Sequence, residues 1–146
     1  MNKLHYIIVA IFLFFNSACK AQDTLKCEVL TALLDVEKLN TDLKLGSNAG
    51  YIRILDQSEM FRNCECSYKN FSIGIIENIP LDFNTGRYID LAILKASDTG
   101  NMFNLEIFYA LSGQQDDYPN LFTGDIILTK TKAGIIVKKA NIDNTQ

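Results

Sequence analysis

Histidine and tryptophan are almost absent from the chain. His5 is the single histidine among 146 residues, and there is no tryptophan. Because His5 lies in an N-terminal segment that we expect to be removed, the mature chain would contain no histidine. Catalytic triads and most zinc sites depend on imidazole as a base or ligand. The sequence therefore excludes Ser-His-Asp and Cys-His catalysis, and it predicts a protein that is not an enzyme and holds no cofactor or metal.

An excess of positive charge is also lacking. Lys and Arg number 14 against 17 Asp and Glu, a net charge of −3. Nucleic-acid binding depends on a basic surface that neutralises phosphates, so we expect no nucleic-acid partner. Hydrophobic residues make up 48% of the chain, which is typical of a globular domain rather than a disordered one.

The chain has no apolar run long enough to span a bilayer. Its longest, Tyr6–Phe15, follows Lys3 and has ten residues, whereas a spanning helix needs about 20. A short apolar run after a positive charge is the pattern of a secretory signal. We therefore expect a signal peptide over residues 1–18 and a single domain over 19–146, with a short N-terminal tether.

The end of this segment carries a resemblance. Residues 16–19 read Asn-Ser-Ala-Cys, and this run resembles the lipobox of bacterial lipoproteins, although Asn16 stands where that family usually has an apolar residue. The resemblance implies a palmitate-type lipid anchor on Cys19 and attachment to the cell envelope, at the outer membrane or on the periplasmic side. The alternative is ordinary cleavage after Ala21, which would leave a periplasmic protein.

Three cysteines remain in the body of the chain: Cys27, Cys64 and Cys66. An oxidising envelope lets disulfides persist, so we expect Cys27 to pair with either Cys64 or Cys66. The odd number leaves one thiol unpaired or paired between chains. Three cysteines without histidine are too few for a zinc site, and the Cys-Glu-Cys spacing differs from the C-x-x-C redox motif.

Apolar periodicity predicts one helix followed by strands. The helix is expected to begin near Leu25 and to end before Gly46, with an apolar stripe of Leu25, Val29, Leu33, Val36 and Leu39. Strands are expected over residues 51–55, 71–76, 88–95, 102–111, 125–131 and 134–142. The predicted fold class is α+β, with the N-terminal helix packed on one face of a five- to six-stranded antiparallel meander sheet.

Two pairs of carboxylates are candidates for acid/base chemistry, Asp56 with Glu59 and Asp116 with Asp117. Asp56 follows a predicted strand, where aspartate favours a turn or helix cap. The second pair belongs to an oxygen-rich run, residues 114–120, that lacks the ligand spacing of an EF-hand. We therefore interpret the first pair as a turn and the second as a solvated loop.

The segment Ser112–Gly124 is the longest break between predicted strands in the C-terminal half. Long loops on a rigid scaffold often carry binding residues. Its candidate partner-binding residues are Asp116, Asp117, Tyr118 and Phe122. The alternative is that Leu121 and Phe122 pack into the core and fix the loop. A further basic strip on the last hairpin, made of Lys130, Lys132, Lys138 and Lys139, is expected to block edge-to-edge pairing.

Two functional hypotheses follow. The first is a non-catalytic envelope lipoprotein that binds another envelope protein or a glycan and reaches the membrane through its lipid anchor. The second is a small envelope hydrolase that depends on carboxylates or a thiol. The second requires two acidic side chains that converge in a cleft, or an exposed reactive cysteine.

Overall fold

The computed structural model describes residues 23–46, 48–78, 88–111 and 119–145. Residues 1–22, which contain the expected signal and Cys19, and residues 112–118 of the expected binding loop lie outside these ranges. Within the described residues, no helix combines the length and hydropathy needed to cross a membrane.

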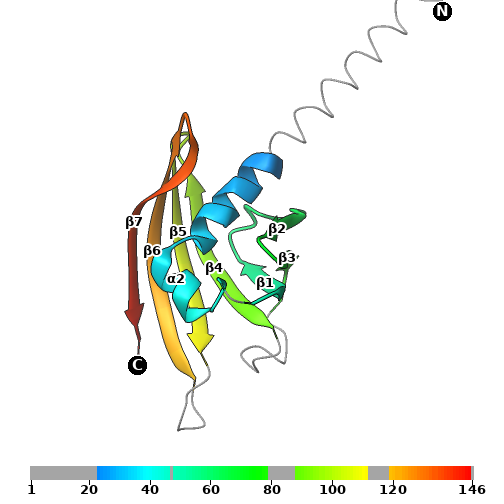
Figure 1. The fold of residues 1–146 in the computed structure, drawn as a ribbon. Helices are drawn as coiled ribbons and strands as arrows, with labels where there is room; N and C mark the ends of the chain where they lie inside the picture. The colour runs from blue at the N-terminus through cyan, green and yellow to red at the C-terminus, as the bar shows by residue number, and fades with distance from the viewer. Residues whose placement is uncertain (1–22, 47, 79–87, 112–118, 146) are drawn as a thin grey trace, which may run out of the picture.

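The described residues form one seven-stranded sheet in the order β2-β3-β1-β4-β5-β6-β7, which curls around two helical segments (Figure 1). The strands are β1 (Gly50–Asp56), β2 (Cys66–Tyr68), β3 (Phe71–Ile76), β4 (Ile89–Asp98), β5 (Met102–Leu111), β6 (Asn120–Thr131) and β7 (Gly134–Asn144). A mostly β arrangement with a helix packed against one sheet face agrees with the coarse prediction.

The prediction of a five- to six-stranded antiparallel meander is wrong in strand number and in direction. β2 is a strand that the sequence pattern did not indicate, and it pairs antiparallel with β3. β1 runs parallel to both of its neighbours, β3 and β4. The physical reason is that the chain turns back through β2 after β1, so that β3 and then β4 are added on either side of β1. Only β4 to β7 form an antiparallel meander.

The helices cover the inner face of the curl. Helical residues 23–34 cross the central strands, and the short α2 (Glu37–Asp42) lies over the β5–β6 side (Figure 1). Leu30, Leu33 and Leu39 are fully buried in the same cluster as Ile54 and Ile107 of the sheet. The predicted stripe is therefore the core-facing side of the helical region. Burial of such side chains contributes about 1.5–3 kcal/mol each relative to exposure.

The predicted single helix is interrupted at Asp35 and Val36. The carbonyl of Leu34 accepts hydrogen bonds from the Asn40 side-chain amide at 3.0 Å and from the Tyr68 hydroxyl at 3.3 Å. The Tyr68 hydroxyl also lies 2.6 Å from a carboxylate oxygen of Asp35. In a continuous helix the Leu34 carbonyl would accept a hydrogen bond from a backbone amide one turn later; here the side chains of Asn40 and Tyr68 donate to it instead. The break is therefore a tertiary effect of the β2 region.

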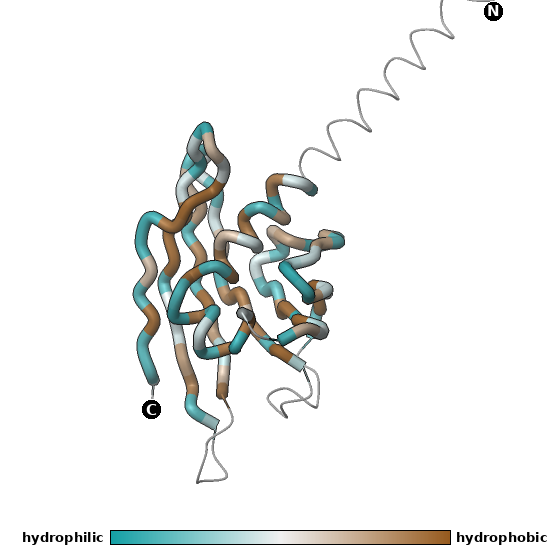
Figure 2. Tube along the Cα trace, in the orientation of Figure 1, coloured by the Kyte–Doolittle hydropathy of each residue, from teal (hydrophilic) through white to brown (hydrophobic). Residues whose placement is uncertain are grey.

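β7 is an edge strand, and it is hydrophobic near its start and mostly hydrophilic beyond it (Figure 2). Ile136 and Val137, near its start, are 49% and 39% exposed. Val137 pairs with Leu128 and Lys139 with Ile127, so Lys138 is an extra residue in a β-bulge. Lysines and bulges hinder the addition of further strands to an edge. Lys138 and Lys139 thus lie on an edge strand, and their blocking role stays a prediction.

A disulfide joins Cys27, in the first helical segment, to Cys66 at the start of β2, with 5.5 Å between the Cα atoms. This bond is one of the two pairings that the sequence left open. It links the helical layer to the β2 edge of the sheet across 39 residues of chain. Cys64 is buried and is the free cysteine of the described residues.

Candidate functional site

The outer face of β4 to β7, opposite the helices, is the candidate site, and we call it the open face. Along β5, Phe103, Leu105, Ile107 and Tyr109 are buried under the helices, and the alternate side chains point the other way. Strand register then places two neighbouring rows on the open face. One is Lys95, Glu106, Asp125 and Asn141, and the other is Ser97, Asn104, Ile127 and Lys139.

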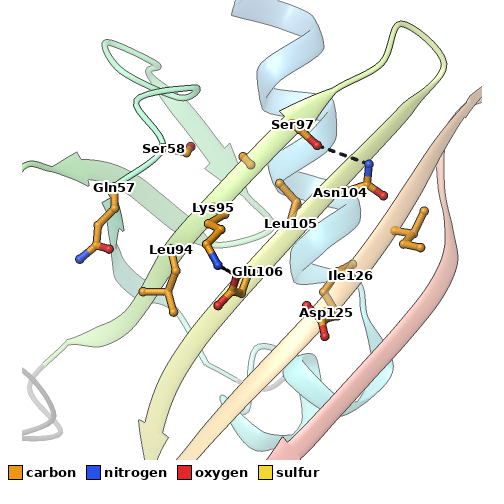
Figure 3. A pocket seen from close by; sticks show the side chains of 12 residues that line it. Gln57, Ser58, Leu94, Lys95, Ser97, Asn104, Leu105, Glu106, Asp125 and Ile126 are labelled. Carbon is orange, nitrogen blue, oxygen red and sulfur yellow. Dashed lines mark hydrogen bonds and ion pairs between the residues drawn. The ribbon is translucent and has the colours of Figure 1, made fainter.

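A β-bulge in β4 shapes this face. Ile93 pairs with Ile107 and Lys95 pairs with Glu106, so Leu94 is the extra residue. Both Leu94 and Lys95 therefore project from the open face, as Figure 3 shows. Bulges redirect side chains in this way and are frequent beside functional sites.

The bulge borders a groove of about 760 Å³ that crosses β4, β5 and β6. Gln57 and Ser58, from the turn after β1, line one side, and Asp125 and Ile127 line the other (Figure 3). The volume falls within the range of small-molecule and peptide pockets. The lining mixes apolar Leu94 with amide and carboxylate groups, which suits recognition of a polar partner.

Three charged side chains cross the groove on adjacent strands. The Lys95 ammonium lies 2.6 Å from a carboxylate oxygen of Glu106, and Asp125 stands opposite Glu106 on β6. The hydrogen bond and charge of Glu106, with a smaller contribution from Asp125, hold the pKa of Lys95 above its usual value. Two carboxylates directly opposite each other repel, and Lys95 pairs with Glu106 rather than with Asp125. The row therefore keeps an excess negative charge at Asp125.

The predicted pair Asp56 and Glu59 is a turn. Asp56 is buried, and its carboxylate accepts hydrogen bonds from the backbone amides of Ser58 at 3.0 Å and Phe61 at 2.7 Å. Glu59 is exposed, and its carboxylate lies 3.7 Å from Arg62. With its oxygens used for backbone capping, Asp56 fixes the turn after β1, in agreement with our structural interpretation.

The expected binding loop is shorter than the sequence suggested, because β6 begins at Asn120. Phe122 lies within this strand, and its ring stacks on that of Tyr109 at 5.0 Å between centroids. Lys38 of α2 lies 4.8 Å above the same ring. Phe122 thus packs on the helix side of the sheet, as the alternative above predicts for this residue, whereas Leu121 is not part of the core cluster. Asp116, Asp117 and Tyr118 lie outside the described residues.

The described cysteines offer no exposed thiol. Cys27 and Cys66 form the disulfide, and Cys64 is only 5% exposed. Burial raises the pKa of the Cys64 thiol, partly opposed by nearby Lys26. Reactive cysteines are accessible and have lowered pKa values. Cys64 has neither property. No group of three or more His, Cys, Asp or Glu side chains in the described part of the chain could hold a metal ion.

A buried ion pair between β1 and β4 escaped sequence reasoning. Arg53 donates to both carboxylate oxygens of Asp90, at 2.7 and 2.9 Å, and the Asp90 side chain is 2% exposed. The Tyr88 ring lies 4.1 Å from the Arg53 guanidinium carbon. Arg53 and Asp90 are register partners of parallel strands. The pair fixes this register, and its charges are used within the fold.

Comparisons with protein-family models, with curated proteins and with solved structures find no match for the chain.

Proposed function

We propose that the protein is an exported, lipid-anchored interaction module of the cell envelope that binds a protein or glycan partner through its open face. The observation that carries this proposal is the groove on that face. The groove is lined by the apolar side chains of Leu94 and Ile127 and by one positive and two negative side chains, Lys95, Glu106 and Asp125. The helices cover one side of the sheet, and the groove on the other side has both polar and apolar lining. Such a surface is suited to binding another molecule.

The disulfide supports the export part of the proposal. Disulfides persist in oxidising compartments and are rare in the cytosol. The Cys27–Cys66 bond therefore fits the export signal expected from residues 1–18. A diacylated Cys19 would hold the domain at a membrane, because each buried methylene contributes about 0.8 kcal/mol.

The non-catalytic reading is supported by how the candidate reactive groups are used. Asp56 caps a turn, and Cys64 is buried. Glu106 and Asp125 are the remaining close carboxylates of the groove, but Lys95 occupies Glu106 and the groove lies on a sheet face rather than in a closed cleft. Acid/base hydrolysis depends on two carboxyl groups that flank the bond to be broken, one of them protonated. The open face is better suited to binding than to catalysis.

Replacing the expected lipidation residue tests the anchor. We expect Cys19→Ser to move the protein from the membrane fraction to the soluble envelope fraction, because the acyl chains would be lost. Immunoblots of fractionated cells measure this, and Cys64→Ser serves as a control that changes a different cysteine. Unchanged partitioning of Cys19→Ser would contradict the lipid anchor.

A bulky cation on the open face tests the binding surface. We expect Asn104→Arg to remove the specific partners that wild type captures after cross-linking in intact envelopes, because the new side chain fills the groove between Ser97 and Ile127. Glu28→Arg adds the same group to an exposed helix position and should leave capture unchanged. Identical partner sets from the two variants would rule out the open face.

A further inference from the structure

We infer that one partner of the open face is a second copy of this chain, bound face to face through reciprocal Asp125–Lys139 contacts. The inference rests on the function proposed above, because it names an occupant of the same surface. What distinguishes it is that the open face carries both members of a complementary charge pair.

The two groups are available on the same surface. Within the described residues, the side chains of Asp125 and Lys139 make no hydrogen bond or close ion pair, and both residues are exposed; the Asp125 carboxylate acts on Lys95 only through its charge. Lys139 pairs in register with Ile127, so its side chain leaves the sheet on the open face. The bulge places Lys138 on this face as well, with its ammonium 3.6 Å from the Met102 sulfur. Lys138 and Lys139 make the middle of β7 positive on this face, Asp143 adds a negative charge near the end of β7, and the β5–β6 side carries Glu106 and Asp125.

Strand geometry makes the charges self-complementary. Asp125 and Lys139 stand on adjacent strands one row apart, about 8 Å between Cα atoms by standard sheet spacing. Consider a two-fold axis that lies in the plane between two such faces. If it passes midway between Asp125 and Lys139, perpendicular to the line that joins them, each carboxylate faces the lysine of the other copy. Ile127 then lies close to the axis and meets its own counterpart. Facing sheets stand about 10 Å apart, a gap that aspartate and lysine side chains bridge together.

The apolar residues of the face fit such an interface. Leu94, Phe108 and Ile127 are partly exposed there, and Ile136 is 49% exposed. Four strands with eight residues each present roughly 500 Å² of flat surface. Stable interfaces bury about 800 Å² of accessible surface per partner, and transient ones bury less. We therefore expect a reversible dimer at about 1–100 µM chain, favoured further where anchored copies share one membrane.

Charge reversal and its repair test the contact. The full chain is purified in density-matched detergent, and its mass is measured by sedimentation across this concentration range. Wild type should form a salt-sensitive dimer, because exposed ion pairs are screened. Asp125→Lys and Lys139→Asp should each weaken dimerisation about tenfold or more through two like-charge contacts. The double variant, in which the charges are exchanged, should restore the wild-type dimer.

Two controls make the result specific. Glu28→Lys, which reverses a charge on the exposed helix side, should leave the dimer unchanged. Ile127→Cys should give a disulfide-linked dimer on mild oxidation, while Ser67→Cys on β2, distant from the face, should not. Equal unfolding midpoints would show that each variant is folded.

The inference is overturned if the chain sediments as a monomer throughout, or if exchanging the charges fails to restore association. In either case, loss of other partners from Asn104→Arg would still uphold the proposed binding function. Conversely, the exchanged charges could restore the dimer while Asn104→Arg leaves the capture of other partners unchanged. That result would support self-association and refute the wider binding role.

Discussion

Replacing Cys27 and Cys66 by serine together is expected to lower the free energy of unfolding by about 4 kcal/mol. The bond closes a loop with a sequence separation of 39 residues, and cross-linking restricts the unfolded chain more than the folded one. Typical domains are stable by only 5–15 kcal/mol, so this loss would remove a large share of the total. Both cysteines are replaced so that neither can form a new bond with Cys64.

Urea unfolding followed by circular dichroism measures the loss. Without the cross-link the unfolded chain exposes more surface, so the dependence of unfolding free energy on urea should also become steeper. Cys64→Ala is the matched control. It keeps the disulfide and should cost only about 1 kcal/mol for the buried sulfur. A double-serine variant as stable as Cys64→Ala would show that the disulfide does not stabilise the fold.

Local pattern was sufficient where neighbouring residues decide the structure. The alternation of Met102–Leu111 reproduces β5 with the same bounds, because every second side chain faces the helices. Residues 71–76 likewise coincide with β3. The apolar stripe predicted the buried face of the helical region. The expected oxidising compartment and the number of cysteines indicated a disulfide from Cys27 to Cys64 or Cys66.

Features that depend on distant residues were missed. The helix break requires Tyr68, more than thirty residues beyond Asp35, to reach the Leu34 carbonyl. The parallel placement of β1 depends on where β3 and β4 settle, although Ile52–Asp56 are consecutively buried, which is typical of a central parallel strand. In the sequence, Arg53 and Asp56 interrupt the apolar residues of this segment, so its burial on both faces was not apparent.

The open face was missed for a related reason. Its charges are scattered through the sequence, and only register brings Lys95, Glu106 and Asp125 into one row. The bulge that turns Leu94 toward the same face has no turn residue to mark it. The sequence instead predicted a binding loop over residues 112–124, because that segment lacks a strand pattern. The loop is shorter than this, since β6 already begins at Asn120.

The Arg53–Asp90 pair leads to the second large prediction. Asp90→Asn should destabilise the protein by about 3–5 kcal/mol, because it removes the buried negative charge that accepts two hydrogen bonds from the Arg53 guanidinium. Side-chain exposures of 11% and 2% leave little water to compensate. The substitution preserves shape, so the loss reports charge rather than packing.

A double variant separates this effect from the value of the pair itself. Replacing both residues by apolar ones of similar volume, Arg53→Met with Asp90→Leu, removes two desolvation costs together with their mutual attraction. We expect it to recover more than half of the stability lost in Asp90→Asn, with Tyr88 packing against the new methionine. Urea unfolding of the wild type, of Arg53→Met alone, of Asp90→Leu alone and of the double variant gives the coupling free energy between the two positions.

The sign of that coupling decides what the pair does. Recovery in the double variant would mean that Arg53 and Asp90 chiefly exclude wrong neighbours for β1, since a one-residue slip along β4 would leave each charge buried against an apolar side chain. Losses that simply add would give a coupling of zero and would contradict this, because each residue would then stabilise the fold independently of the other. Because β4 joins the parallel half of the sheet to the meander that bears the open face, a slipped β1 register would also displace the Gln57–Ser58 wall of the groove.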